Sequence, residues 1–114
     1  MYLLEAIKRA EELRPGAGSE EYTAQSVWAL EQIFAEKLGK TPVECPYPHD
    51  APLSIGAPFD LAYVYYAAAQ NDLSAGDTEL YDLDSALYNA AFSAALSRLR
   101  RNTRPKKSVV FKTI

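Results

Sequence analysis

The chain has 114 residues, of which 48% are hydrophobic and 24% charged, with one cysteine among them. A chain of this length forms one domain and can bury a core without metals or disulfides, and a single cysteine excludes an internal disulfide. The longest apolar run, Leu61 to Ala69, is about half of what a membrane-spanning helix requires, so we expect no membrane contact. The opening residues lack a signal-peptide pattern, and we expect folding in the cytoplasm.

The formal net charge of −3 hides a polarity along the chain. All 15 acidic residues precede Arg98, whereas seven of the 12 basic residues lie from Arg98 onward. An acidic body with a basic end suits head-to-tail association of subunits, and it also suits contact with nucleic acid. A solvated basic end is the third interpretation.

Two amphipathic helices are predicted in the first third of the chain. The first ends at Pro15-Gly16, and the second runs from an N-cap at Ser19 to a stop at Gly39. The apolar face of the first consists of Leu3, Leu4, Ile7 and Ala10. The core-facing stripe of the second consists of Val27, Leu30, Phe34 and Leu38, widened by Tyr22, Trp28 and Ile33.

Residues 40–58 contain five of the seven prolines, so neither a helix nor a central strand is expected there. We expect a long ordered loop or an arm that reaches a neighbouring subunit. Beyond it, a third helix is predicted from Pro58 to a stop at Gly76. A fourth, capped by Asp77 or Thr78, extends to about Asn102, and the two helices should form an antiparallel hairpin.

The fourth helix carries two apolar faces. One consists of Leu80, Leu83, Leu87 and Ala94, and the other of Tyr88, Phe92, Ala95 and Leu99. This arc is wider than one packing stripe, and the alanines along it permit close approach of another helix. We therefore expect contacts beyond the chain's own core, with another subunit as a candidate.

Residues 105–114 form a basic and β-prone tail after the helical domain of residues 1–104. Its backbone groups could pair with the edge of an adjacent subunit, and a frayed end is the alternative. The candidate partner-binding residues are Arg98, Arg100, Arg101, Arg104, Lys106, Lys107, Val109, Val110 and Phe111. The basic ones could also contact DNA phosphates non-specifically, which makes a small DNA-binding protein the alternative function.

The sequence gives no positive support for an enzyme, a cofactor or a metal site. Cys45 and His49 lie four positions apart, but a zinc site needs about four ligands and a nucleophile pair needs an orienting third group. The carboxylates at the start of the fourth helix are explained by its dipole. They are Asp77, Glu79, Asp82 and Asp84.

The last two predicted helices and the residues that follow them contain a recognisable set of residues: Asp72, Gly76, Tyr81, Ala86, Tyr88-Asn89-Ala90-Ala91-Phe92, Ala94, Arg101 and Pro105-Lys106. This pattern resembles a family of small head-tail connector (adaptor) proteins of long-tailed phages and prophages. The opening helix before Pro15 and the Ser19 cap before Trp28 are similar too. The chain departs from the family pattern at Asp82-Leu83 and at Arg98-Leu99-Arg100. These departures affect the contacts between subunits that the resemblance implies, and not the helix hairpin.

The resemblance implies an all-α subunit without catalytic residues. It implies a ring of roughly a dozen copies that docks under the portal, between head and tail, around a central passage for DNA. Its partners would be other copies of itself and the portal and tail or neck proteins. Its location would be the virion neck, and the bacterial cytoplasm during assembly.

Overall fold

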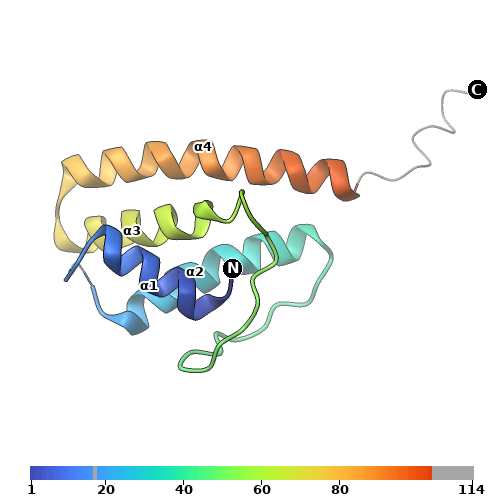
Figure 1. The fold of residues 1–114 in the computed structure, drawn as a ribbon, viewed down its shortest axis with the longest axis horizontal. Helices are drawn as coiled ribbons and strands as arrows, with labels where there is room; N and C mark the ends of the chain where they lie inside the picture. The colour runs from blue at the N-terminus through green and yellow to red at the C-terminus, as the bar shows by residue number, and fades with distance from the viewer. Residues whose placement is uncertain (17, 104–114) are drawn as a thin grey trace, which may run out of the picture.

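The computed structural model describes residues 1–16 and 18–103. Four helices follow one another in this range: α1 (Leu3–Leu13), α2 (Glu20–Lys37), α3 (Leu61–Ala75) and α4 (Thr78–Thr103). The described range has no β-strand, and its only β-type pairing is an isolated bridge between Tyr2 and Pro52. The predicted all-α bundle with a hairpin of its last two helices is confirmed (Figure 1). The predicted tail, residues 105–114, lies outside the described residues.

The helix ends are set by the capping residues that the sequence indicated. The Ser19 hydroxyl accepts a hydrogen bond from the Tyr22 amide at 3.1 Å and caps α2. Gly76 ends α3 in the left-handed conformation at φ 76°, where a residue with a Cβ is strained. The prediction that Pro58 lies in the first turn of the third helix is wrong. Residues 57–60 form a turn, and α3 begins at Leu61.

Helix α3 is the central helix of the bundle. It contacts each of the other three helices, whereas the backbone of α4 lies beside α3 alone (Figure 1). This position explains the apolar run from Leu61 to Ala69, because a helix packed on several sides needs apolar residues around most of its circumference. The buried residues of this run are Ala62, Tyr63, Val64, Ala67, Ala68 and Ala69.

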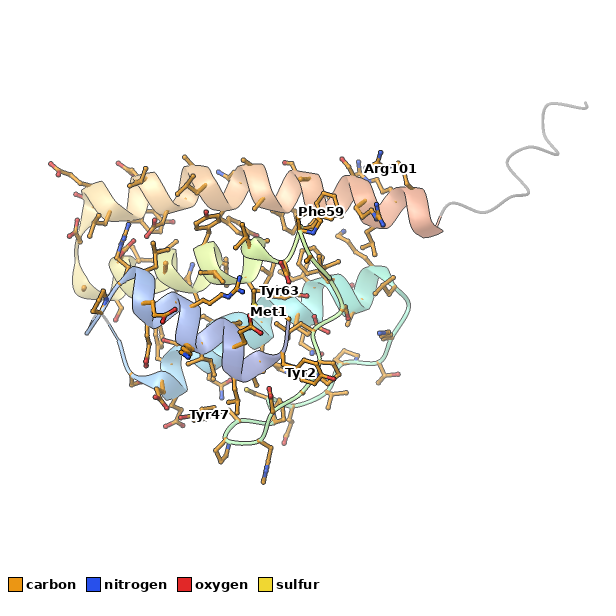
Figure 2. All side chains as sticks on the ribbon, viewed as in Figure 1. Met1, Tyr2, Tyr47, Phe59, Tyr63 and Arg101 are labelled. Atoms are coloured by element: carbon orange, nitrogen blue, oxygen red, sulfur yellow. The ribbon has the colours of Figure 1, made fainter. Side chains whose placement is uncertain are left out.

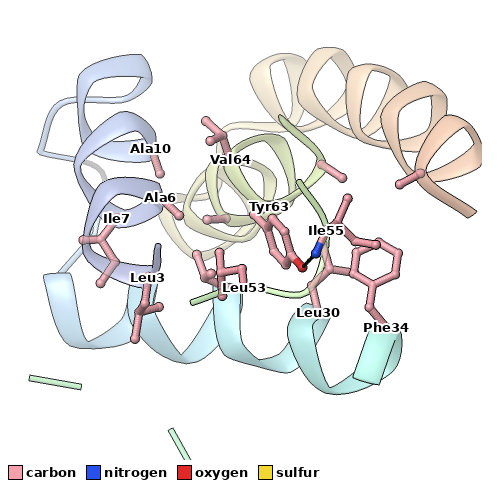
Figure 3. Close-up of a cluster of buried hydrophobic side chains, with 14 of the residues drawn as sticks. Leu3, Ala6, Ile7, Ala10, Leu30, Phe34, Leu53, Ile55, Tyr63 and Val64 are labelled. Atoms are coloured by element: carbon pink, nitrogen blue, oxygen red, sulfur yellow. Dashed lines mark hydrogen bonds between the residues drawn. The ribbon is translucent and has the colours of Figure 1, made fainter. Parts of the chain in front are cut away.

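The core lies where α1, α2 and α3 meet (Figure 3), and aromatic rings extend it to α4. The Phe34 ring meets Tyr63 edge-on at 5.6 Å between centroids and stacks on Phe92 at 5.5 Å. Tyr88 lies 5.1 Å from Tyr66 and 5.5 Å from Phe92, so rings from three helices form one continuous cluster.

Two details of the expected core faces differ from the structure. In α1, Ala6 rather than Leu4 faces the core, and Leu4 is 40% exposed. In α2, Val27, Leu30 and Phe34 are buried as predicted. The expected widening of that stripe is wrong for Tyr22 and Ile33, which are each 40% exposed.

The loop between α2 and α3 is ordered and packs on its own chain. The Leu3 amide donates to the Ala51 carbonyl oxygen at 2.8 Å, and the Leu53 amide donates to the Met1 carbonyl oxygen at 3.1 Å. Leu53 and Ile55 are buried in the core. The Tyr47 hydroxyl lies 2.8 Å from a Glu20 carboxylate oxygen (Figure 2). These contacts hold the segment against the bundle, as expected for an ordered loop, and contact with a neighbouring subunit stays a prediction.

A buried carboxylate fixes the end of this loop. Glu31, which is 6% exposed, accepts hydrogen bonds from the Ser54 amide at 2.9 Å and from the Tyr63 hydroxyl at 2.7 Å. The Ser54 hydroxyl lies 2.6 Å from the other oxygen of Glu31. The Ile55 amide donates to the Tyr63 hydroxyl at 3.2 Å, so α2, the loop and α3 share one network (Figure 3). Burial, followed by the bond to Glu31, raises the pKa of Tyr63.

We expect Tyr63→Phe to lower the free energy of unfolding by about 1–3 kcal/mol, because it leaves Glu31 with one donor fewer in a buried position. Urea denaturation followed by circular dichroism measures this change. Tyr65→Phe is the control, since Tyr65 lies on the same helix but outside this network. Equal stability of the two variants would contradict the role given to Glu31.

Candidate assembly surface

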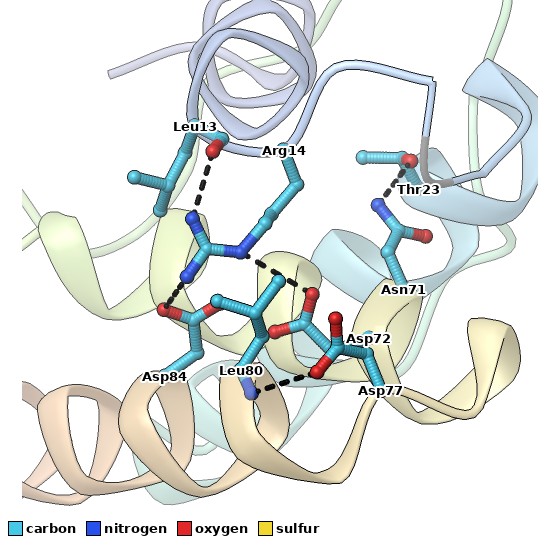
Figure 4. A network of polar contacts seen from close by, with 8 residues as sticks. All are labelled: Leu13, Arg14, Thr23, Asn71, Asp72, Asp77, Leu80 and Asp84. Carbon is cyan, nitrogen blue, oxygen red and sulfur yellow. Dashed lines mark hydrogen bonds and ion pairs between the residues drawn. The ribbon is translucent and has the colours of Figure 1, made fainter.

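One arginine joins three helices at the turn between α3 and α4. Arg14 is the residue that follows α1, and its Nη2 lies 2.9 Å from Asp84 Oδ1 on α4. Its Nε lies 3.3 Å from Asp72 Oδ1 on α3 (Figure 4). Asp72 and Asp84 are 2% and 0% exposed. The position of α4 relative to α1 therefore depends on an ion-paired cluster shielded from water.

The cluster holds more negative than positive charge. Two carboxylates share one guanidinium, and the Oδ2 atoms of Asp72 and Asp84 are buried without a hydrogen-bond partner. Burial, followed by the neighbouring carboxyl group of Asp84, raises the pKa of Asp72 to about 7, and the charge of Arg14 opposes this rise. We expect a proton shared by the two carboxyl groups to supply the donor that these atoms lack and to reduce their repulsion.

The assignment of Asp84 to compensation of the helix dipole is wrong, because Asp84 is buried and paired with Arg14, 70 positions away in the chain. Asp77 does act at the helix start, where its Oδ1 accepts from the Leu80 amide at 3.1 Å. The sequence does contain an indication that Asp84 is buried. Asp84 lies four positions before Tyr88 and therefore on the side of α4 that faces α3, where a charged residue requires a partner.

The two apolar faces expected on α4 differ in exposure. Tyr88, Phe92, Ala95 and Leu99 are buried or half-buried against the bundle. On the other predicted face, Leu80 is half-buried, whereas Leu83, Leu87 and Ala94 are exposed. We define the exposed side as the outer face of α4: Leu83, Ala86, Leu87, Ala90 and Ala94. Leu83 is 54% and Leu87 39% exposed. No helix of the described chain covers this face, along the upper edge of Figure 1.

Opposite charges stand at the two ends of the outer face. Glu79 and Asp82 are exposed near the start of α4. Arg98, Arg100 and Arg101 are exposed in its last turns, and the guanidinium of Arg98 lies over the Phe59 ring at 5.6 Å from its centroid. The other predicted partner-binding residues lie outside the described part of the chain. They are Arg104, Lys106, Lys107, Val109, Val110 and Phe111.

Cys45 and His49 both lie in the loop between α2 and α3. Cys45 is half-buried, and its Sγ lies 3.8 Å from the Ala24 carbonyl oxygen. His49 is exposed, and its amide donates to the Pro46 carbonyl oxygen at 2.8 Å. Among the residues described, no group of three His, Cys, Asp or Glu side chains is arranged to hold a metal ion.

Within residues 1–16 and 18–103, none of the helices combines the length and hydrophobicity needed to cross a bilayer. No protein-family model, curated protein or solved structure matches the chain.

The raised pKa of Asp72 predicts a pH dependence of stability. Between pH 3.8 and about 7 the folded protein holds a proton that the unfolded chain releases, so the contribution of Asp72 to stability falls as the pH rises through this range. We expect the free energy of unfolding of wild type to fall by about 1 kcal/mol or more over this pH range, relative to that of Asp72→Asn, because the amide does not ionise.

Urea denaturation at several pH values measures the difference. Asp82→Asn is the matched control, since Asp82 is an exposed acid on α4. A wild-type curve that runs parallel to the Asp72→Asn curve would contradict the shared proton.

Proposed function

We propose that this protein is a structural subunit of the neck of a long-tailed phage, a head-tail connector that assembles as a ring under the portal. The observation that carries the proposal is the outer face of α4. Exposed leucines alternate with alanines along a helix, and a surface of this kind is stabilised when another protein covers it. Its activity is binding, first in the host cytoplasm and then in the virion.

The residues that resemble the connector family support the proposal through the hairpin that they form. Tyr88 and Phe92 pack in the aromatic cluster between α3, α4 and α2. Asp72 belongs to the cluster around Arg14, and Gly76 makes the turn between the two helices. The motif therefore holds α4 in place by its inner side, and the outer face is left for partners.

The charge distribution supports contacts of the head-to-tail type that a ring requires. Such contacts join two different surfaces of each subunit, and opposite charges on those surfaces favour one orientation. The basic end of α4 is one such surface. Exposed acids on α1 and α2 provide the other: Glu5, Glu12, Glu20 and Glu21. Arginines near a central passage would also meet DNA phosphates.

Assembly with the portal protein of the same phage tests the proposal. We expect native mass spectrometry of the mixture to show a complex with several copies of this chain, and Leu83→Lys with Leu87→Lys to abolish it without loss of helical circular dichroism. Glu36→Lys is the control, because Glu36 is exposed on α2. A chain that never joins the portal would contradict the proposal. Tight, steeply salt-dependent binding to DNA in its place would favour the DNA-binding alternative.

The residues after the described helix allow a second test. We expect removal of Ser108 to Ile114 to weaken assembly more than folding, because we assign this segment to a neighbouring subunit. Portal binding and the urea midpoint, measured on the same protein, separate the two effects. Lost folding with unchanged assembly would reject the assignment.

A further inference from the structure

We propose that the outer face of α4 binds the same face of a second copy, with the two helices antiparallel around a two-fold axis at Ala90. The inference rests on the proposed function in treating this face as the assembly surface. It adds the partner that covers the face in the free protein. The occupant is a second copy because the face is complementary to itself in charge and in shape.

The charges select the antiparallel orientation. Glu79 and Arg101 lie equally far from Ala90 along α4, on opposite sides of it, and both are exposed. An antiparallel pair centred on Ala90 therefore places Glu79 of each copy beside Arg101 of the other. Asp82 lies eight positions before Ala90 and Arg100 ten positions after it, at the same edge of the face because of the helical rotation of 100° per residue. They therefore approach each other on one flank, with an offset of about 3 Å along the helix axis. A parallel pair would instead bring like charges together.

The apolar residues fit the same register. Ala90 meets Ala90 at the axis, where the absence of larger side chains lets the backbones approach closely. Leu87 of each copy then faces Ala94 of the other, so a large side chain opposes a small one. Both leucines of the face leave water in this arrangement, and Leu83 and Leu87 are the residues there with the most apolar surface to bury.

A two-fold contact closes after two copies, whereas a ring needs head-to-tail contacts. The pair is therefore the form of the free subunit, and it must open before the outer face can contact the neck. This arrangement shields an apolar surface until the partner is present. Binding to the portal and pairing of α4 then compete for the same residues.

Disulfide trapping tests the register directly. In a Cys45→Ser background, we expect Ala90→Cys to form a covalent dimer on mild oxidation, because the two positions meet at the axis. Leu73→Cys is the control, since Leu73 is 55% exposed on α3, away from the face. Equal cross-linking of both variants, or none of Ala90→Cys in protein with native circular dichroism, would overturn the proposal.

Charge reversal provides an independent measurement. We expect Arg101→Glu to weaken self-association about tenfold, because the substitution enters the symmetric contact twice, and Glu79→Lys in the same chain to restore it. Sedimentation equilibrium gives the dissociation constants. Failure of the second substitution to restore binding would overturn the pairing. Portal binding without cross-linking at position 90 would leave the proposed function standing, and cross-linking without portal binding would remove the proposed function alone.

Discussion

The guanidinium of Arg14, held between Asp72 and Asp84, is the interaction on which the arrangement of this molecule depends. It connects the end of α1 to the hairpin of α3 and α4, which lies far from α1 in the sequence. The backbone of α4 lies beside α3 alone, so this cluster is what ties the start of α4 to α1. Because the carboxylates are buried, their interaction with Arg14 is little screened by salt but depends on protonation.

Beyond the Arg14 cluster, α4 is held in place by contacts with α2, α3 and the loop before α3. The aromatic cluster around Phe92 and Tyr88 packs its middle against α2 and α3, and Arg98 lies over Phe59 near its end. The aromatic contacts of Tyr88 and Phe92 use the inner side of the helix, so no helix of the described chain covers the outer face. A helix held rigidly on one side can present a defined pattern of charge and shape on the other, and self-association and docking both need such a pattern.

The helices were predictable because their signals are local. Ser19, Gly39 and Gly76 act through the geometry of one helical turn, and the apolar run of α3 reflects burial on several sides.

The pairing of Arg14 with Asp84 and of Glu31 with Tyr63 was not predictable in this way. Those partners are separated by 70 and 32 positions, and their meeting depends on the packed bundle. The folding back of the loop was missed for the same reason, since proline content says where a helix stops and not where the chain then goes. The outer face was partly predictable, because α4 has more apolar residues than one stripe can use.

Both proposals place another protein over the outer face of α4. Hydroxyl-radical footprinting of Leu87, read by mass spectrometry at increasing protein concentration and then with the portal protein, measures whether this face is covered. We expect ready oxidation of Leu87 in dilute protein and strong protection in both other conditions, with Leu73 on α3 unchanged on self-association. Oxidation of Leu87 that stays the same in all three conditions would contradict both proposals.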